Sequence, residues 1–322
     1  MRDVMTKIED EAKDLSLRAA GSEVRGGAAG RHVLSGDMPT MDEAVRLWVE
    51  QHPDDAMEAE AARRMDQLGD GGAEDEALEE LLRLQEGGSV LASYVFAAMQ
   101  LDREHPEARD AGLALMTYAA DRGFPPACWH MAADCLTETG EDAFNRSWEW
   151  LGRGAMAGSC ECCVEMGSLF LNSAVHLPEE SCRMLAEQLL DFARSGSWKP
   201  LETLLNLGLA KVPGTMPAEA LDEALALLLE YAEGGHVPAM TLAGVMHAEG
   251  RLLERDRHEA ARWLKGAWQA GSAEGGCQLA RLWLNDPAAD RAETEEAREI
   301  LEICCLDDNA LAHALMARTA ME

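Results

Sequence analysis

Two short stretches of this chain hold residue types that could do chemistry, and the first is a cluster of three cysteines. Cys160, Cys162 and Cys163 offer soft metal ligands, or a nucleophilic thiol, within four residues. Zinc sites usually space their ligands as C-x-x-C with a second pair further along the chain, whereas this cluster reads C-x-C-C and lacks that second pair. The spacing therefore favours buried packing cysteines over a metal site.

The second stretch begins at His258 and Glu259, where the sequence is similar to half of the H-E-x-x-H motif of zinc proteases. Arg262 stands where the second histidine ligand belongs, so the motif fails on ligand count. The sequence also contains no G-x-S-x-G elbow, Walker loop or dinucleotide fingerprint. We therefore predict that the chain is not an enzyme and binds no cofactor and no metal. The alternative is an enzyme-associated subunit, or a hydrolase, that uses the cysteine cluster.

The excess of acidic residues indicates which classes of partner the protein could bind. The chain has 59 acidic and 28 basic residues, which gives a formal net charge of −31. A surface of this sign repels phosphate backbones, so we predict no nucleic-acid partner, and it attracts a basic protein or peptide. An inhibitor or immunity-type protein that blocks a basic partner is a second hypothesis on the same ground.

The sequence also favours one cell compartment. Its nine cysteines include the adjacent pairs Cys162-Cys163 and Cys304-Cys305, which is not the spacing of a disulfide framework and fits a reducing environment. The first 20 residues interleave acidic and apolar side chains, unlike a signal peptide. No stretch approaches the roughly 20 apolar residues that a membrane helix requires. We therefore expect a cytoplasmic protein with no membrane partner.

The elements that would position these residues are revealed by an internal repeat of glycines. Straight-chain residues and alanine dominate the sequence, which favours an all-α fold. The spacings between successive glycines of the repeat are 35, 35, 38, 39 and 36 residues, and an aspartate continues the register 37 residues later. These anchor positions are Gly88, Gly123, Gly158, Gly196, Gly235, Gly271 and Asp308. A period of this length is typical of helical solenoids.

Columns at fixed offsets from the anchors explain the repeat physically. The position seven residues before each anchor is apolar in all seven units, as is the position eight residues after it. Positions four and nine residues after each anchor are mostly Ala, Gly or Cys, which lets helix backbones approach closely. Each anchor glycine suits the left-handed residue that ends a helix. The pattern predicts helical pairs that bury their apolar faces by stacking.

These columns predict an N-terminal segment and one helical array. Residues 1–36 are expected to form a short helix followed by a flexible glycine-rich linker. Residues 37–322 are expected to form an α/α superhelical solenoid of about eight helix-turn-helix repeats, the first of them an atypical cap. The predicted repeats are 37–69, 70–104, 105–140, 141–177, 178–212, 213–251, 252–287 and 288–322.

Residues 239–275 match these columns best, and the segment resembles the Sel-one-like repeat, a subfamily of tetratricopeptide-like helical hairpins. The matching positions are Ala239, Ala243-Gly244, Gly250, Asp256, Ala260, Trp263-Leu264, Ala267 and Gly271, and a second match runs from Ala127 to Gly158. His247 stands where the family usually has an aromatic residue. The resemblance implies a non-catalytic scaffold or adaptor that holds a protein or peptide on a concave face.

Candidate residues for contacting that partner are aromatic side chains and histidines near the starts or ends of the second helices. Exposed tryptophans are common anchors of protein interfaces. The predicted partner-binding residues are Trp129, His130, Trp198, His247 and Trp283. The last helix spaces Leu311, Leu315 and Met316 along one face, so we also expect that self-association could proceed through this C-terminal helix.

Overall fold

The computed structural model describes residues 38–68, 74–101, 106–138, 140–173, 177–210, 216–306 and 310–319 of the chain. Within these ranges all regular secondary structure is α-helical, and the predicted all-α fold is confirmed. The helix and linker predicted for residues 1–36 lie outside the described residues.

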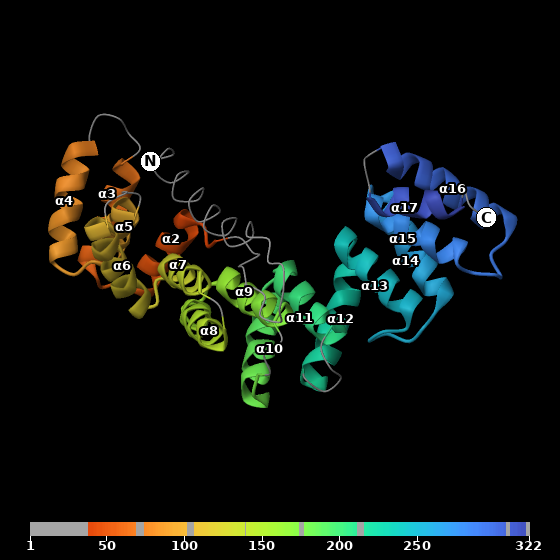
Figure 1. Cartoon of the computed structure of the whole chain (residues 1–322), viewed down its shortest axis with the longest axis horizontal. Coiled ribbons are helices and arrows are strands. Elements are labelled where there is room, and N and C mark those ends of the chain that lie inside the picture. The colour runs from red at the N-terminus through yellow and green to blue at the C-terminus, as the bar shows by residue number, and fades with distance from the viewer. Residues whose placement is uncertain are drawn as a thin grey trace. The chain divides into compact units, whose positions relative to one another are not determined.

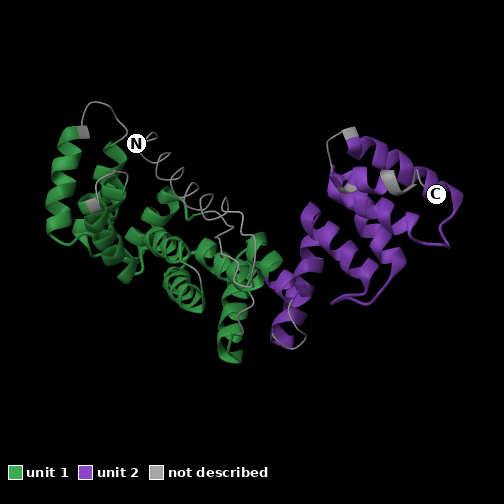
Figure 2. Cartoon of the chain, in the orientation of Figure 1, with its two compact units in different colours: residues 1–203 green, residues 204–322 purple. Residues whose placement is uncertain are grey.

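The helices follow one another in antiparallel pairs along the chain (Figure 1). They divide into two compact units, residues 1–203 and residues 204–322 (Figure 2), and the division falls within α11. The helices have the bounds α2 Met41–Gln51, α3 Ala56–Gln67, α4 Glu74–Glu86, α5 Val90–Leu101, α6 Pro106–Asp121, α7 Pro125–Cys135, α8 Glu141–Met156, α9 Cys160–Leu171, α10 Glu179–Arg194, α11 Trp198–Ala210, α12 Ala218–Glu233, α13 Val237–Glu249, α14 Arg257–Gln269, α15 Ala273–Leu284, α16 Arg291–Leu306 and α17 Ala310–Thr319.

The anchor glycines end helices as predicted. All six have positive φ angles, from 84° at Gly123 to 102° at Gly196. At Gly123 the amide donates to the carbonyl of Ala120 at 2.9 Å, and the next amide, of Phe124, donates to Ala119 at 3.1 Å. These bonds satisfy carbonyls that the helix end leaves free, in a conformation that costs a residue with a Cβ more than glycine.

The helices that pack most extensively are joined by the loops without an anchor glycine. In unit 1 these pairs are α5 with α6 and α7 with α8, and in unit 2 they are α13 with α14 and α15 with α16. The contact is close because a small residue lies at the crossing: a Cβ placed on Gly244 of α13 would lie 2.6 Å from Cγ of Leu264 on α14. The close pair α13 and α14 spans the segment that resembles the Sel-one-like repeat, whereas each range counted from the sequence joins the two helices on either side of an anchor position.

The C-terminal helix α17 closes the core of unit 2. Leu315 is only 5% exposed and packs in a cluster with Trp283, Ile300 and Leu301, while Met316 packs against the same cluster. The expectation that this helix exposes an apolar face for self-association was therefore wrong at Leu315, because α16 and α15 already cover it. The side chain of Leu311 lies outside the described residues.

Candidate binding pocket in unit 2

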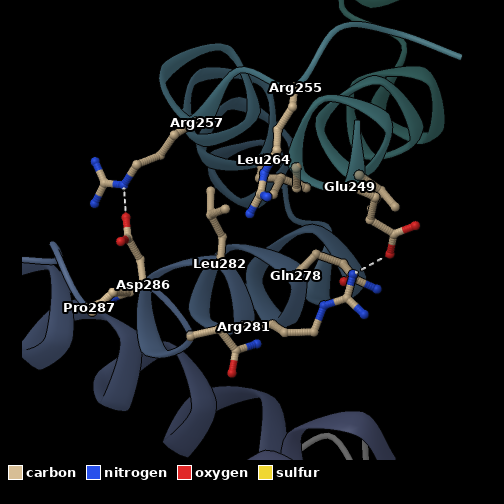
Figure 3. A pocket seen from close by; sticks show the side chains of 12 residues that line it. Glu249, Arg255, Arg257, Leu264, Gln278, Arg281, Leu282, Asp286 and Pro287 are labelled. Carbon is tan, nitrogen blue, oxygen red and sulfur yellow. Dashed lines mark hydrogen bonds and ion pairs between the residues drawn. The ribbon is translucent and has the colours of Figure 1, made fainter. Parts of the chain in front are cut away.

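A pocket of about 430 Å³ opens in unit 2 between helices α13, α14 and α15. Figure 3 shows its charged groups: Arg257 pairs with Asp286 on one side, Arg281 pairs with Glu249 on the other, and Arg255 extends from its loop toward Leu264. The volume lies within the range of pockets that hold small ligands or a few residues of a peptide.

The loop from Gly250 to Asp256 presents Arg255. Gly250 is left-handed, with φ 67°, and ends α13 by donating its amide hydrogen to Met246 at 2.9 Å. Leu252 has φ 62° and is the one non-glycine residue with positive φ in the described part of the chain. A Cβ at Gly250 would lie 2.9 Å from the Cβ of Arg255, so the loop folds tightly on itself and needs glycine there.

Two contacts of His247 hold this loop in place. Its Nδ1 lies 2.9 Å from the carbonyl oxygen of Glu254, and its own carbonyl accepts from the amide of Asp256 at 3.1 Å. Asp256 then caps α14, because its carboxylate accepts from the amides of Glu259 and His258, and these bonds lower the pKa of Asp256. Both ends of the loop are thus fixed to helices, which sets the point from which Arg255 projects.

The three arginines of the pocket differ in how they are paired. Arg257 bonds to both Asp286 and Glu293, and the Glu293 carboxylate raises the pKa of the Arg257 guanidinium. Arg281 donates to Glu249 at 3.0 Å. Arg255 is exposed and has neither a hydrogen bond nor an ion pair among the residues that the structure describes. The pocket therefore holds one guanidinium group whose five N–H donors have no protein partner.

Gln278 adds an unused acceptor to the same pocket. Its Nε2 donates to Glu274 at 2.6 Å, which fixes the orientation of the amide, and its Oε1 is buried without a hydrogen-bond partner. Buried polar atoms are normally paired. Val245, Leu264 and Leu282 supply apolar surface beside it. The pocket thus combines a guanidinium without a direct bond, a buried acceptor and an apolar wall.

The structure places the predicted partner-binding residues in different surroundings. Trp129 and Trp283 are 2% and 4% exposed, so both are core residues that present no surface to a partner, contrary to the expectation. His130 lies between the rings of Tyr94 and Trp129, and burial lowers its pKa to about 4. Both tryptophans are buried because α7 packs between α6 and α8, and α15 packs between α14 and α16.

The two remaining candidates are partly exposed. Trp198 begins α11, is half-buried and is not among the residues that line the pocket. His247 supports the loop that carries Arg255 and so acts on the pocket indirectly. The arginines themselves were missed in the sequence, although three basic residues within 251–257 of a strongly acidic chain are a signal that could have found them.

The cysteine cluster is packed in unit 1. Cys162 and Cys163 are fully buried, and burial raises the pKa of both thiols, while that of Cys160 rises to about 11. A catalytic thiol needs a lowered pKa, so these environments oppose thiolate chemistry. In the part of the chain that the structure covers, no three His, Cys, Asp or Glu side chains are grouped to hold a metal ion. None of the described helices is long and apolar enough to span a membrane.

Comparisons with known proteins find similarity at the level of solved structures. No protein-family model matches the chain, and no curated protein matches it. A Sel1 repeat protein from Oxalobacter formigenes is 17% identical with a TM-score of 0.41, over 94% of this chain and 99% of that chain. A protective antigen of uropathogenic Escherichia coli strains that displays an SLR fold is 14% identical with a TM-score of 0.35, over 96% of this chain and 73% of that chain.

Proposed function

We propose that this chain is a non-catalytic interaction protein in which the pocket of unit 2 receives a segment of a partner protein. The observation that carries the proposal is the set of unsatisfied groups in one pocket: the guanidinium of Arg255 and the Oε1 of Gln278, beside the apolar side chains of Leu264 and Leu282. Binding sites combine apolar walls with a few well-placed polar groups in this way.

The surroundings of the pocket support binding over catalysis. Its acidic residues, Glu249 and Asp286, are both engaged in ion pairs with arginines, which leaves neither free to act as a general base. Elsewhere, the raised pKa of Cys160 supports a structural role for the cysteine cluster. The net charge of −31 favours a partner with a basic surface, which long-range attraction would bring to the protein before its anchoring segment enters the pocket.

Affinity purification with a matched pair of variants tests the proposal. The full chain and the variants Leu282→Arg and Ile303→Arg are used as bait in native-cell extract, and bound proteins are identified by mass spectrometry. Leu282 lines the pocket, whereas Ile303 is exposed on α16 and does not line it. We expect one partner that is retained by Ile303→Arg and lost with Leu282→Arg. Partners that bind all three baits equally, or none, would contradict the proposal.

A further inference from the structure

We propose that the pocket in unit 2 recognises a carboxylate group on a peptide and that Arg255 is the residue that binds it. The proposal rests on the proposed function and names the chemical group that the partner inserts. Its basis is the difference in pairing between Arg255 and its two neighbours, Arg257 and Arg281.

The N–H donors of Arg255 determine which group the ligand presents. Arg257 and Arg281 bond directly to Asp286, Glu293 and Glu249, whereas the Arg255 guanidinium bonds to no carboxylate and attracts Asp286 only at longer range. The planar fork of arginine matches a carboxylate by two parallel hydrogen bonds, which a lysine cannot reproduce.

The loop that carries Arg255 is held in a strained conformation. Leu252 adopts φ 62°, a left-handed conformation that is unfavourable for a residue with a Cβ. The conformation persists because His247 and Asp256 tie the loop to α13 and α14. Backbone strain that neighbouring contacts over-determine is concentrated at binding sites, where it fixes a side chain in advance of the ligand. The ordered loop therefore fixes the backbone of Arg255 before binding, so that only its side chain loses freedom when a ligand binds.

Gln278 and the apolar wall determine what lies next to the carboxylate. The buried Oε1 of Gln278 accepts a hydrogen bond, so it pairs with an N–H such as a peptide amide. Val245 and Leu264 provide surface for an apolar side chain. A residue that carries a carboxylate, a peptide N–H and an apolar group satisfies all three features, and both a chain terminus and an acidic side chain supply the same carboxylate chemistry.

Small probes that differ by one group test the assignment. The full chain, labelled with ¹⁵N, is titrated with N-acetyl-leucine, N-acetyl-leucinamide, N-acetyl-aspartic acid α-amide and inorganic phosphate, and binding is followed by NMR shifts of pocket residues. We expect N-acetyl-leucine to bind saturably with a Kd in the millimolar range, about the affinity of one anchored residue, and its carboxamide to bind at least tenfold more weakly. Tighter binding of the aspartate probe than of the leucine probe would assign the carboxylate to a side chain, and the reverse order to a chain terminus.

Arginine variants distinguish specific binding of the carboxylate at Arg255 from non-specific attraction to positive charge. Arg255→Gln is expected to weaken N-acetyl-leucine at least tenfold, and Arg255→Lys to weaken it less. Arg251→Gln serves as the matched control, because Arg251 lies in the same loop and does not itself line the pocket. Arg251 bonds to Leu209 and lies 3.8 Å from Glu249, which keeps its hydrogen bond to Arg281 in the variant, so binding should stay within twofold. Equal losses in Arg251→Gln, equal binding of the carboxamide, or equal binding of phosphate would each overturn the carboxylate assignment.

Arg255→Gln, used as bait in the affinity purification, distinguishes this inference from the proposed function. If a protein partner is lost with Leu282→Arg but kept with Arg255→Gln, the pocket binds a protein and the carboxylate assignment is wrong. If the partner is lost with both and kept with Arg251→Gln, the two proposals stand together.

Discussion

The two units use charged side chains for opposite purposes. In unit 1 Glu58 of α3 is 3% exposed, and its carboxylate accepts from Ser89 Oγ at 3.1 Å, from the Val90 amide at 2.6 Å and from the Leu91 amide at 3.1 Å. The negative charge lies at the N-terminus of α5, where the helix dipole also favours it. In unit 2 Arg255 lies in an open pocket without a partner. One helical architecture thus contains a buried carboxylate with hydrogen-bond partners in unit 1 and an exposed guanidinium without them in unit 2.

The packing around each charge explains the difference. In unit 1 the N-terminal helix α2 contacts α7, beyond its immediate neighbours, through Trp48, whose ring lies 5.6 Å from that of Phe124. Gln51 of the same helix donates to the carbonyl of Ala157 at 3.0 Å. In unit 2 the loop 250–256 separates α13 from α14 and turns Arg255 outward. Glu58 is covered where α3 packs against α4 and α5, whereas Arg255 stays open in the loop between α13 and α14.

The largest loss of stability is expected when Glu58 is replaced, which tests whether unit 1 depends on its buried charge. Replacing it by alanine leaves the Val90 and Leu91 amides and the Ser89 hydroxyl without an acceptor in the core, so we expect Glu58→Ala to lower the free energy of unfolding of unit 1 by about 3 kcal/mol. Urea denaturation followed by circular dichroism measures the change. Glu60→Ala, on the exposed side of the same helix, is the control and should cost less than about 1 kcal/mol. Equal costs would mean that Glu58 is not a structural cap.

A second effect depends on pH and arises from His130 in unit 1. Burial lowers the pKa of the folded imidazole to about 4 from its ordinary value near 6.5. The unfolded chain therefore binds a proton at a pH where the folded chain does not, so stability is fully present above about pH 6.5 and is lost as the pH falls toward 4. The loss reaches about 3 kcal/mol, from 1.36 kcal/mol for each unit of pKa difference.

His130→Phe removes this titration and keeps a ring of similar size. The free energy of unfolding of the wild type should fall relative to that of His130→Phe between pH 7 and pH 4, as measured by urea denaturation at each pH. Titrating carboxylates affect both proteins alike, so the difference isolates His130. A difference that does not change with pH would show that the imidazole reaches solvent in the folded protein.

The sequence predicts those features that depend on a single residue's conformation. Gly123 and Gly235 could be identified as helix ends because positive φ is a local property that favours glycine. Which neighbouring helices pack most closely could not be identified from the sequence. It depends on contacts between helices, such as the close approach of Gly244 on α13 to Leu264 on α14. A list of punctuating glycines marks where helices end and leaves open which neighbours pack.

The candidate site was harder to predict than the fold. Trp283 has the composition of an interface anchor, yet its position on α15 faces the core, and helical periodicity alone did not separate the two faces. Arg255 belongs to a pocket only because α13, α14 and α15 converge around it, and its lack of an acidic partner depends on where Glu249 and Asp286 are already engaged. Pairing of charges is a tertiary property, whereas the number of charges is read from the sequence.

A smaller effect is expected at Arg281, whose ion pair with Glu249 joins α15 to α13 across the pocket. Both side chains are about one-third exposed, so solvent screens the pair. We expect Arg281→Gln to lower the free energy of unfolding of unit 2 by less than about 1 kcal/mol. Thermal denaturation in low and high salt checks this, because the loss should shrink as salt screens the wild-type pair. A loss of several kcal/mol would mean that the ion pair between Arg281 and Glu249 stabilises the fold as strongly as the buried Glu58 carboxylate does.

The smallest effect is expected at Arg255, and it separates the two uses of charge most sharply. Because Arg255 has no hydrogen bond or ion pair in the described structure, removing its charge costs only its longer-range attraction to Asp286. We expect Arg255→Gln to change the free energy of unfolding by less than about 0.5 kcal/mol, the usual range for surface substitutions. Thermal and urea denaturation of the variant beside wild type measure it. A residue that is neutral for stability and decisive for binding N-acetyl-leucine is a ligand-binding residue; a loss above 1 kcal/mol would instead make Arg255 a structural support of its loop, and the strain at Leu252 would then serve folding and not binding.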